Sequence, residues 1–319
     1  MVDILLTGGA GFIGFHVAKA LLERGDKVII VDNFNNYYDP KIKEDRISKI
    51  NDDPGLTVIK ADISDYSAME KIFLENKFTK VCHLAAQAGV RYSLENPFAY
   101  EKSNNIGTLN LLELCRKYQI KDFVFASSSS VYGGNKKIPF SETDPVDSPI
   151  SAYAATKRYN ELIAHTYHHL FGLNCTGLRF FTVYGPWGRP DMAAYLFATQ
   201  ILKGKKIKVY NHGNMKRDFT FVSDIVAGVL AAIDKSLPYE IFNLGNSNTV
   251  ELNYFISLIE KELGITAEKE LLPIQPGDVP ETFADISKAK RMLGFDPKVK
   301  IEEGVKEFIS WFRTYRQGS

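Results

Sequence analysis

The sequence has 319 residues, of which 45% are hydrophobic and 24% charged, so it is long enough for one large domain or two modest ones. Its formal net charge is +1 and like charges do not cluster, which argues against nucleic acid or an anionic membrane as the main partner. The apolar run at residues 4–6 is too short for a signal peptide or a membrane span, and no later segment is long enough. We therefore expect a cytoplasmic protein with a small-molecule partner.

Cysteine and histidine spacings indicate neither a disulfide framework nor a metal centre. Cys82, Cys115 and Cys175 lie in apolar runs without metal-ligand spacing, so we expect three reduced, buried thiols. His168 and His169 have no third ligand at a suitable spacing, which favours a solvated helix face. The sequence therefore predicts no metal site.

The N-terminal segment combines a strand, a glycine-rich turn and the start of a helix. An apolar run of strand type precedes TGGAGFIG at residues 7–14, and a helical run follows. Gly8 permits the tight turn, Gly11 lets the backbone approach a pyrophosphate, and Gly14 lets the helix pack close to the strand. The predicted dinucleotide site includes Gly8, Gly11, Phe12, Ile13 and Gly14.

A carboxylate ends the next strand. The apolar run at residues 27–31 leads to Asp32, at the spacing where a carboxylate accepts hydrogen bonds from an adenosine ribose diol. Asp32 would also repel a 2′-phosphate, so it favours NAD over NADP. We assign the neighbouring Asn33 to the same site. The alternative is an aspartate that merely caps a turn.

Strands and helices then alternate. Strand-like runs at residues 56–60, 80–84 and 122–126 are separated by helical runs at residues 66–75 and 98–118. This order predicts an α/β fold of Rossmann type, with a doubly wound parallel sheet whose ligand lies at the carboxyl ends of the strands. The residues expected at those ends are Asp62 and Ile63 near the adenine, Leu84, Ala85 and Ala86 along the dinucleotide, and Ser127, Ser128, Ser129 and Ser130 near the nicotinamide.

A tyrosine and a lysine lie four residues apart at the start of a predicted helix. Ser151 begins this helix, so Tyr153 and Lys157 share one face. A cation at ~4 Å from a phenolate is worth roughly 4 kcal/mol at an effective dielectric of about 20, or about three pKa units as an upper limit. Lys157 is therefore expected to lower the pKa of Tyr153 and make it an acid/base catalyst. Taken alone, such a pair is also common on solvated helices.

The second half of the chain is expected to hold the substrate. After a strand at residues 174–179, the glycines and prolines of residues 180–192 indicate a loop that leaves the sheet. We place the domain boundary there, with a dinucleotide-binding domain at residues 1–180 and a smaller α/β domain at residues 181–319. Some segments of the second half are expected to return to the first domain.

Four features carry a resemblance to a known family, namely the glycine-rich turn, His83-Leu84-Ala85-Ala86, the serines before Val131-Tyr132-Gly133, and Tyr153 with Lys157. The chain resembles the extended short-chain dehydrogenase/reductase family over essentially its whole length. The resemblance implies that Ser128 binds the substrate oxygen, Tyr153 is the acid/base, and Lys157 holds the cofactor ribose. It also implies that Asn104 and Phe180 lie near the cofactor. The roles of Ser127 and Ser129 beside Ser128 remain open at this point.

Resemblance to the sugar-nucleotide members of the family implies further contacts. Arg217 would pair with the diphosphate, Tyr210 would pack near uracil, and Asp278 would accept from a ribose hydroxyl. Gln275 stands where some relatives have arginine, which implies one fewer cation at the diphosphate. Gln87, Arg91 and Thr182 are expected to border the same pocket. The two long helices resemble those of the family's intersubunit bundle, so we expect a homodimer.

Several members oxidise C4 of the sugar to a ketone, and their reactions then diverge. The dehydratases carry an acidic pair after the catalytic hydroxyl, whereas Ser129 and Ser130 stand here and cannot act as acid or base at neutral pH. The decarboxylases usually have glutamate at the Ser130 position. Epimerisation needs neither group, so the resemblance favours a 4-epimerase.

The loop at residues 185–192 and the segment at residues 275–280 resemble those of UDP-glucuronate 4-epimerases. Arg189 would then hold the C6 carboxylate and keep the β-keto acid intermediate from losing carbon dioxide. The alternatives are a UDP-glucose/galactose 4-epimerase, a UDP-glucuronate decarboxylase and a non-enzymatic dinucleotide sensor, which would need none of Ser128, Tyr153 and Lys157.

Overall fold

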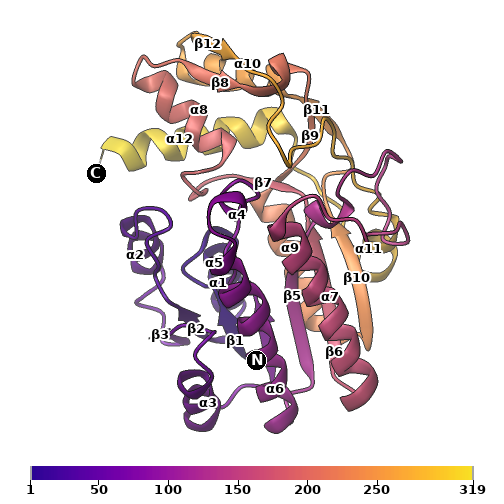
Figure 1. Ribbon diagram of the computed structural model, residues 1–319. Coiled ribbons are helices and arrows are strands. Elements are labelled where there is room, and N and C mark those ends of the chain that lie inside the picture. Colours follow the sequence, from indigo (N-terminus) through magenta and orange to yellow (C-terminus); the bar gives the residue numbers. More distant parts are fainter. Residues whose placement is uncertain (1, 318–319) are drawn as a thin grey trace.

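The computed structural model describes residues 2–317 (Figure 1). Its centre is a seven-stranded sheet in the order β3-β2-β1-β4-β5-β6-β10, in which every neighbouring pair is parallel. The strands are β1 (Asp3–Thr7), β2 (Lys27–Asp32), β3 (Leu56–Lys60), β4 (Lys80–His83), β5 (Asp122–Ser128), β6 (Asn174–Phe180) and β10 (Tyr239–Leu244). The Rossmann-type sheet predicted from the sequence is thereby confirmed.

Helices cover both faces of this sheet, which is why its strands are apolar on both sides. In β1, Ile4 and Leu6 pack with the helices of one face, and Leu5 between them packs with those of the other. The first face carries α1 (Phe12–Glu23), α9 (Val222–Lys235) and α11 (Ser287–Leu293), and the second carries α3 (Tyr66–Glu75), α6 (Gly107–Lys117) and α7 (Ala152–Phe171).

The helix expected at residues 98–118 is not continuous. It consists of α5 (Pro97–Tyr100), the π-helix η1 (Glu101–Ile106) and α6. Inside η1, the carbonyl of Asn104 accepts a hydrogen bond from the side-chain amide of Asn160, at 2.8 Å. A carbonyl engaged in this way interrupts the regular ladder, as π-bulges commonly do at functional sites.

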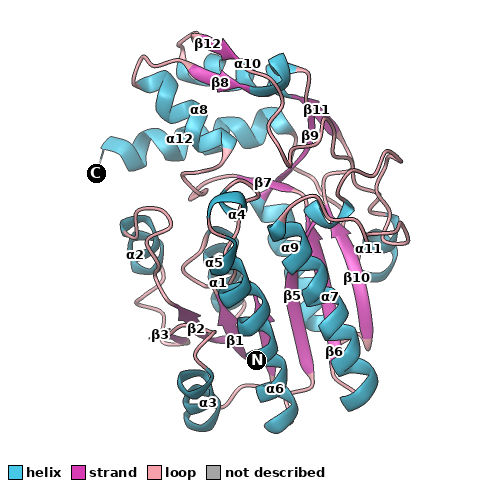
Figure 2. Cartoon of the chain, in the orientation of Figure 1, coloured by secondary structure: helices cyan, strands magenta, loops and turns pink. Residues whose placement is uncertain are grey.

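The second half of the chain builds a smaller unit above the carboxyl ends of the central strands (Figures 1 and 2). It contains a sheet of β7 (Thr182–Tyr184), β9 (Lys216–Phe221) and β11 (Thr249–Glu251), a pair of β8 (Ile207–Val209) and β12 (Lys269–Leu271), and helices α8 (Ala193–Leu202), α10 (Leu252–Leu263) and α12 (Ile301–Gln317). Helix α9 and strand β10 return from this half to the central sheet. The short elements are α2 (Lys41–Ser48), α4 (Tyr92–Glu95), η2 (Ser129–Tyr132) and η3 (Tyr210–Gly213).

Between residues 2 and 317, no helix has both the length and the apolar character needed to cross a membrane.

Candidate active site

A cavity of about 1040 Å³ lies between the carboxyl ends of the central strands and the smaller unit. The predicted residues that line it are Gly8, Gly11, Phe12, Ile13, Gly14, Asp32, Asn33, Ile63, Leu84, Ala85, Ala86, Gln87, Arg91, Ser127, Ser128, Ser129, Tyr153, Lys157, Phe180, Thr182, Arg189, Tyr210, Arg217 and Asp278. Three predicted residues, Asp62, Asn104 and Gln275, do not line it. Ligands commonly bind at this edge of a doubly wound sheet.

The glycine-rich turn joins β1 to α1 and packs too tightly for a Cβ at two of its positions. Gly8 has a φ of +73°, and a Cβ there would lie 2.6 Å from the backbone nitrogen of Ala85. A Cβ on Gly14 would lie 2.1 Å from the carbonyl oxygen of Gly8. Both positions therefore require glycine. The turn leaves a backbone cradle at the N-terminus of α1, which fits a pyrophosphate.

Asp32 lies at the end of β2, beside this cradle. Its carboxylate accepts from the backbone nitrogens of Ala10 at 3.2 Å and Phe34 at 2.9 Å. These bonds hold the carboxylate in the cavity wall, where a ribose diol could reach it.

The carboxylate of Asp62 forms hydrogen bonds within the protein. Its carboxylate accepts from the backbone nitrogen and the hydroxyl of Ser64, at 2.9 and 2.7 Å, and Lys102 lies 3.5 Å away. Burial opposes ionisation, but these hydrogen bonds and the lysine charge outweigh it and lower the pKa of Asp62. The neighbouring Ile63, which was also predicted near the adenine, lines the cavity.

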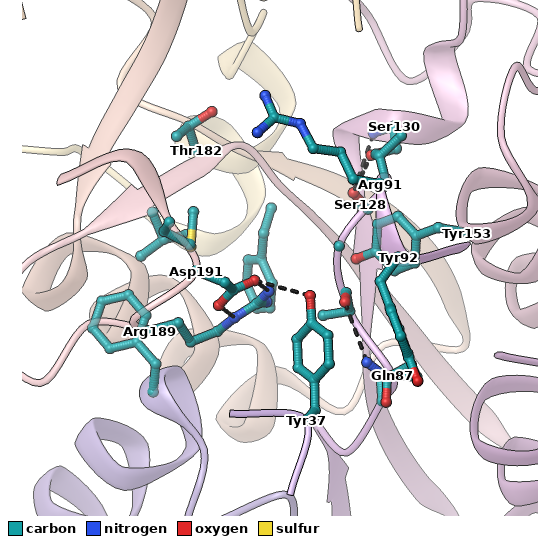
Figure 3. Close-up of a pocket in the computed structure, with 18 of the residues that line it drawn as sticks. Tyr37, Gln87, Arg91, Tyr92, Ser128, Ser130, Tyr153, Thr182, Arg189 and Asp191 are labelled. Atoms are coloured by element: carbon teal, nitrogen blue, oxygen red, sulfur yellow. Dashed lines mark hydrogen bonds and ion pairs between the residues drawn. The ribbon is translucent and has the colours of Figure 1, made fainter. Parts of the chain in front are cut away.

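The serine cluster after β5 separates into two roles. Ser127 donates its hydroxyl to Glu161, at 2.6 Å, and Glu161 forms a buried bidentate pair with Arg179 at 2.8 and 2.9 Å. The hydroxyl of Ser127 is thus engaged by Glu161, and its contact with a substrate stays a prediction. Ser128 is the last residue of β5 and the N-cap of η2, and its hydroxyl lies 3.0 Å from that of Ser130 at the cavity wall (Figure 3).

Tyr153 and Lys157 lie on the first turns of α7, whose N-cap Ser151 accepts from the nitrogen of Ala154 at 3.1 Å. Figure 3 places the Tyr153 ring beside Ser128. The ammonium of Lys157 is buried and donates to the carbonyl of Ala126 at 2.8 Å. Burial lowers the pKa of Lys157 to about 8, against the opposing effect of Glu161.

The electrostatics of Tyr153 differ from the sequence-based expectation. Burial raises its pKa, and the hydrogen bond with Ser128 and the charge of Arg189 lower it only in part. Lys157 is not among the groups that shift the pKa of Tyr153, so the expected lowering by its ammonium is not found. Arg189, on the opposite side of the pocket, supplies the cation that acts on the phenol.

Asn104 proves to be a support for the site. Its side chain accepts from the nitrogen of Gln87 at 2.8 Å and donates to the carbonyl of Gln87 and the hydroxyl of Thr156, both at 3.0 Å. Its side chain is buried and these bonds engage its amide, and its place near the cofactor stays a prediction. It joins the loop after β4 to the helix that carries Tyr153.

Arg189 forms a cluster with Asp191 and Tyr37, of which the sequence analysis predicted only Arg189. Its Nε and Nη2 donate to the two carboxylate oxygens of Asp191, at 3.0 and 2.5 Å, and Tyr37 donates its hydroxyl to the same carboxylate at 3.1 Å (Figure 3). Tyr37 and Asp191 were missed. Asp191 could have been predicted from its charge, which is opposite to that of Arg189 two residues earlier in the same loop.

A second group of side chains lies where the cavity is bordered by both units. Arg91 stacks over Tyr210, with its guanidinium carbon 4.6 Å from the ring centroid, and approaches Asp278 at 3.4 Å. Arg217 donates to the carbonyls of Lys216 and Pro280, at 2.9 and 3.1 Å, and forms no ion pair with a carboxylate among residues 2–317. Two guanidinium groups therefore border the same space.

Gln275 contributes through its backbone. Its carbonyl accepts from the nitrogen of Asp278 at 3.1 Å and so shapes the turn that presents Asp278. Gln275 is not among the residues that line the cavity, and its contact with a substrate stays a prediction.

Comparisons with known proteins agree with this architecture. Residues 5–308 match the family model described as GDP-mannose 4,6 dehydratase. The chain is 48% identical to UDP-glucuronate 4-epimerase 4 of Arabidopsis thaliana, over 99% of this chain and 76% of that one. The chain belongs to the extended short-chain dehydrogenase/reductase family.

Solved members superpose over nearly the whole chain. UDP-glucuronic acid 4-epimerase from Bacillus cereus, in complex with UDP-glucuronic acid and NAD, is 34% identical with a TM-score of 0.93, covering 98% of this chain and 99% of that one. UDP-glucose 4-epimerase from Thermotoga maritima, with UDP-glucose, is 35% identical with a TM-score of 0.90 and the same coverage.

Proposed function

We propose that this protein is an NAD-dependent UDP-glucuronate 4-epimerase that forms UDP-galacturonate through a 4-keto sugar. The observation that carries the proposal is one cavity with Ser128 and Tyr153 on one wall and Arg189 on the other. The family relatives that act on UDP-glucuronate support the choice of sugar.

NAD fits the cradle of the glycine-rich turn, and when bound it supplies a group that accepts a hydride from C4 and returns it. Gly8, Gly11 and Gly14 leave the backbone open to the pyrophosphate. Asp32 accepts from the ribose diol of the adenosine and disfavours a 2′-phosphate. Lys157 holds the other ribose.

Tyr153 is the acid/base. Its phenolate, which the Ser128 hydrogen bond and the charge of Arg189 favour against burial, would take the proton of the C4 hydroxyl when bound NAD supplies the hydride acceptor. Ser128 donates a hydrogen bond to the C4 oxygen and holds it close to Tyr153. When the ketone presents its opposite face for reduction, Tyr153 would give the proton back to the C4 oxygen. Protons and electrons balance over the cycle, and the substrate and product differ only at C4.

Arg189 holds the C6 carboxylate. The 4-keto form of a glucuronate is a β-keto acid, which loses carbon dioxide when its carboxylate bond stands perpendicular to the ketone plane. A guanidinium can fix the carboxylate away from that alignment. Ser129 and Ser130 provide no acid or base for dehydration.

Arg217 and Arg91 bind the diphosphate. Arg217 forms no ion pair with a described carboxylate, so its charge is free to meet a phosphate, and its fork can donate two bonds at once. Tyr210 offers its ring to the uracil and Asp278 accepts from the uridine ribose. Gln87 and Thr182 border the sugar.

One observation favours the rival, a UDP-glucose/galactose 4-epimerase. Asp191 already neutralises Arg189, so the pocket without substrate has no free charge at that point. The comparison with the Thermotoga enzyme is consistent with a neutral sugar as well.

A labelled substrate tests the mechanism. UDP-glucuronate with deuterium at C4 is expected to give UDP-galacturonate that retains the deuterium at C4 in ordinary water, because the hydride goes to the bound cofactor and back. Loss of the label to water would contradict hydride transfer. The Tyr153→Phe protein, with its fold intact, is expected to give no product.

We also propose a cytoplasmic homodimer. Cys82, Cys115 and Cys175 are buried free thiols, as suits a reducing compartment. Helices α4, α5 and α7 and the π-helix η1 lie together on one side. Four large apolar side chains are exposed there, namely Leu94 (55%), Phe98 (82%), Ile106 (43%) and Leu162 (52%). Such a patch is typical of an interface. Phe98→Asp is expected to halve the native mass in solution, and a monomeric mass before substitution would contradict the dimer.

A further inference from the structure

Arg46 is a buried charge that the proposed mechanism does not use. It lies on α2, and its side chain is fully buried. Among residues 2–317 no carboxylate forms an ion pair with it. Its donors go instead to the carbonyl of Trp187 from Nη2 and Nε, at 2.7 and 3.1 Å, and from Nη1 to the carbonyl of Ala10 and the hydroxyl of Tyr38, at 3.0 and 3.1 Å.

These two carbonyls belong to different parts of the site. Ala10 is inside the glycine-rich turn, and its nitrogen donates to Asp32. Trp187 lies two residues before Arg189, in the loop at residues 185–191, which we call the substrate loop. One guanidinium therefore joins the cradle of the dinucleotide to the loop that presents Arg189.

The substrate loop needs such an anchor. Trp187 has a φ of +61°, a conformation that side chains other than glycine rarely adopt and that the surroundings must hold in place. His16 of α1 contributes a hydrogen bond to the carbonyl of Pro186, at 2.8 Å, and Tyr37 bonds Asp191 at the far end of the loop. Three residues of the dinucleotide-binding half thus hold this short segment.

The charge of Arg46 makes this anchor sensitive to the cofactor. A guanidinium buried among neutral acceptors is unfavourable, because carbonyl dipoles offset only part of its lost hydration. An anion held by the glycine-rich turn would offset this charge, since Arg46 already donates to a carbonyl of that turn. Arg46 and the loop it holds are then best ordered when the dinucleotide is bound.

We propose that Arg46 is a positioning residue that couples NAD on the glycine-rich turn to the placement of Arg189 against the sugar. The proposal rests on the proposed function, because it assigns Arg189 to the substrate. By reciprocity, a ligand that orders the substrate loop must also tighten the hold on NAD.

The test measures the release of NAD from the holoenzyme in a Tyr153→Phe background, where turnover is stopped. UDP-glucuronate is expected to slow this release by about tenfold, within the usual range of coupling between sites. UDP, which lacks the sugar, is expected to slow it much less. With Arg46→Met added, the slowing by UDP-glucuronate is expected to fall below about twofold.

Matched variants separate coupling from damage to the fold. Lys41→Met removes an exposed cation from the same helix and is expected to keep the full effect of UDP-glucuronate. Arg46→Lys keeps the charge without the planar fork that reaches both carbonyls, so it should lose most of the coupling. If neither Arg46 variant folds, Tyr37→Phe is used instead. It removes only the hydrogen bond from Tyr37 to Asp191 in the substrate loop, and it should reduce the coupling in part.

The outcomes are distinct. An unchanged slowing in the Arg46 variants would overturn the proposal, since UDP-glucuronate would then merely cover the exit of NAD. Binding of UDP-glucuronate by calorimetry without any effect on NAD release in the Arg46-intact protein would overturn it too. Failure to bind UDP-glucuronate at all would refute the proposed function instead, and the coupling would be tested with UDP-glucose.

Discussion

Arg189 and Asp191 form a bidentate ion pair inside the cavity, with the two nitrogen–oxygen distances at 3.0 and 2.5 Å. Arg189 bonds both carboxylate oxygens of Asp191, and Tyr37 donates to one of the same two oxygens. The pair raises the pKa of Arg189 further above its ordinary value, although burial opposes this. A substrate carboxylate must therefore share a guanidinium that already has an acidic partner.

The first prediction concerns this shared guanidinium. Arg189→Met alone would leave the half-buried carboxylate of Asp191 without its cation, so Asp191→Asn is combined with it. The double variant is expected to lose about 10- to 100-fold in kcat/KM for UDP-glucuronate, as a charge-assisted hydrogen bond of roughly 1.5–3 kcal/mol implies. It should also release more carbon dioxide per turnover.

The control is Asp191→Asn alone. It frees Arg189 and is expected to increase the preference for UDP-glucuronate over UDP-glucose, measured as the ratio of kcat/KM values. An equal loss for both sugars in the double variant would place Arg189 outside the carboxylate subsite.

The second prediction concerns pH. Burial lowers the pKa of Lys157 to about 8, so the ammonium is present below that pH and is lost above it. If the charged lysine holds the cofactor ribose, kcat/KM should fall as the pH rises through about 8. Arginine does not titrate in this range, so Lys157→Arg is expected to be less active but to lose this alkaline limb. An alkaline limb that persists in the variant would assign the titration to another group.

The third prediction concerns the glycine-rich turn. A Cβ at Gly14 would lie 2.1 Å from the carbonyl oxygen of Gly8, and both atoms belong to backbone that cannot rotate away. Gly14→Ala is expected to cost about 1–3 kcal/mol of stability and to reduce the NAD bound per chain after purification. Gly134→Ala is the control, because no atom lies within 4 Å of a Cβ at that position. Full NAD content in Gly14→Ala would contradict the close packing of α1 on β1.

The parts of the fold that follow from local pattern were predictable. Strands β1 to β6 are short, largely apolar runs, and both the glycine-rich turn and the start of α7 at Ser151 are local signals. Each depends on neighbours within a few residues, which a single sequence displays directly.

Two of the predicted site residues, Ser127 and Asn104, form hydrogen bonds with partners far along the chain. Ser127 donates its hydroxyl to Glu161, which lies 34 residues later. The amide of Asn104 is engaged by Gln87 and Thr156, and the Tyr37–Asp191 bond joins residues 154 positions apart. No periodicity in the sequence reports which hydroxyl or amide such partners will engage.

The electrostatic expectation for Tyr153 failed for a related reason. Spacing places Lys157 on the same helical face, but it does not reveal that the ammonium is desolvated and bonded to Ala126. The cation that acts on the phenol is Arg189, which comes from a loop 36 positions later in the printed sequence.

The most direct test of the account is to incubate the purified protein with UDP-glucuronate, without added cofactor, and to identify every nucleotide sugar and any carbon dioxide formed. The account predicts UDP-galacturonate and almost no carbon dioxide, because NAD remains bound and Arg189 restrains the carboxylate. Formation of a UDP-pentose with carbon dioxide would contradict it in favour of a decarboxylase. Inert UDP-glucuronate together with conversion of UDP-glucose to UDP-galactose would contradict it in favour of the neutral-sugar epimerase.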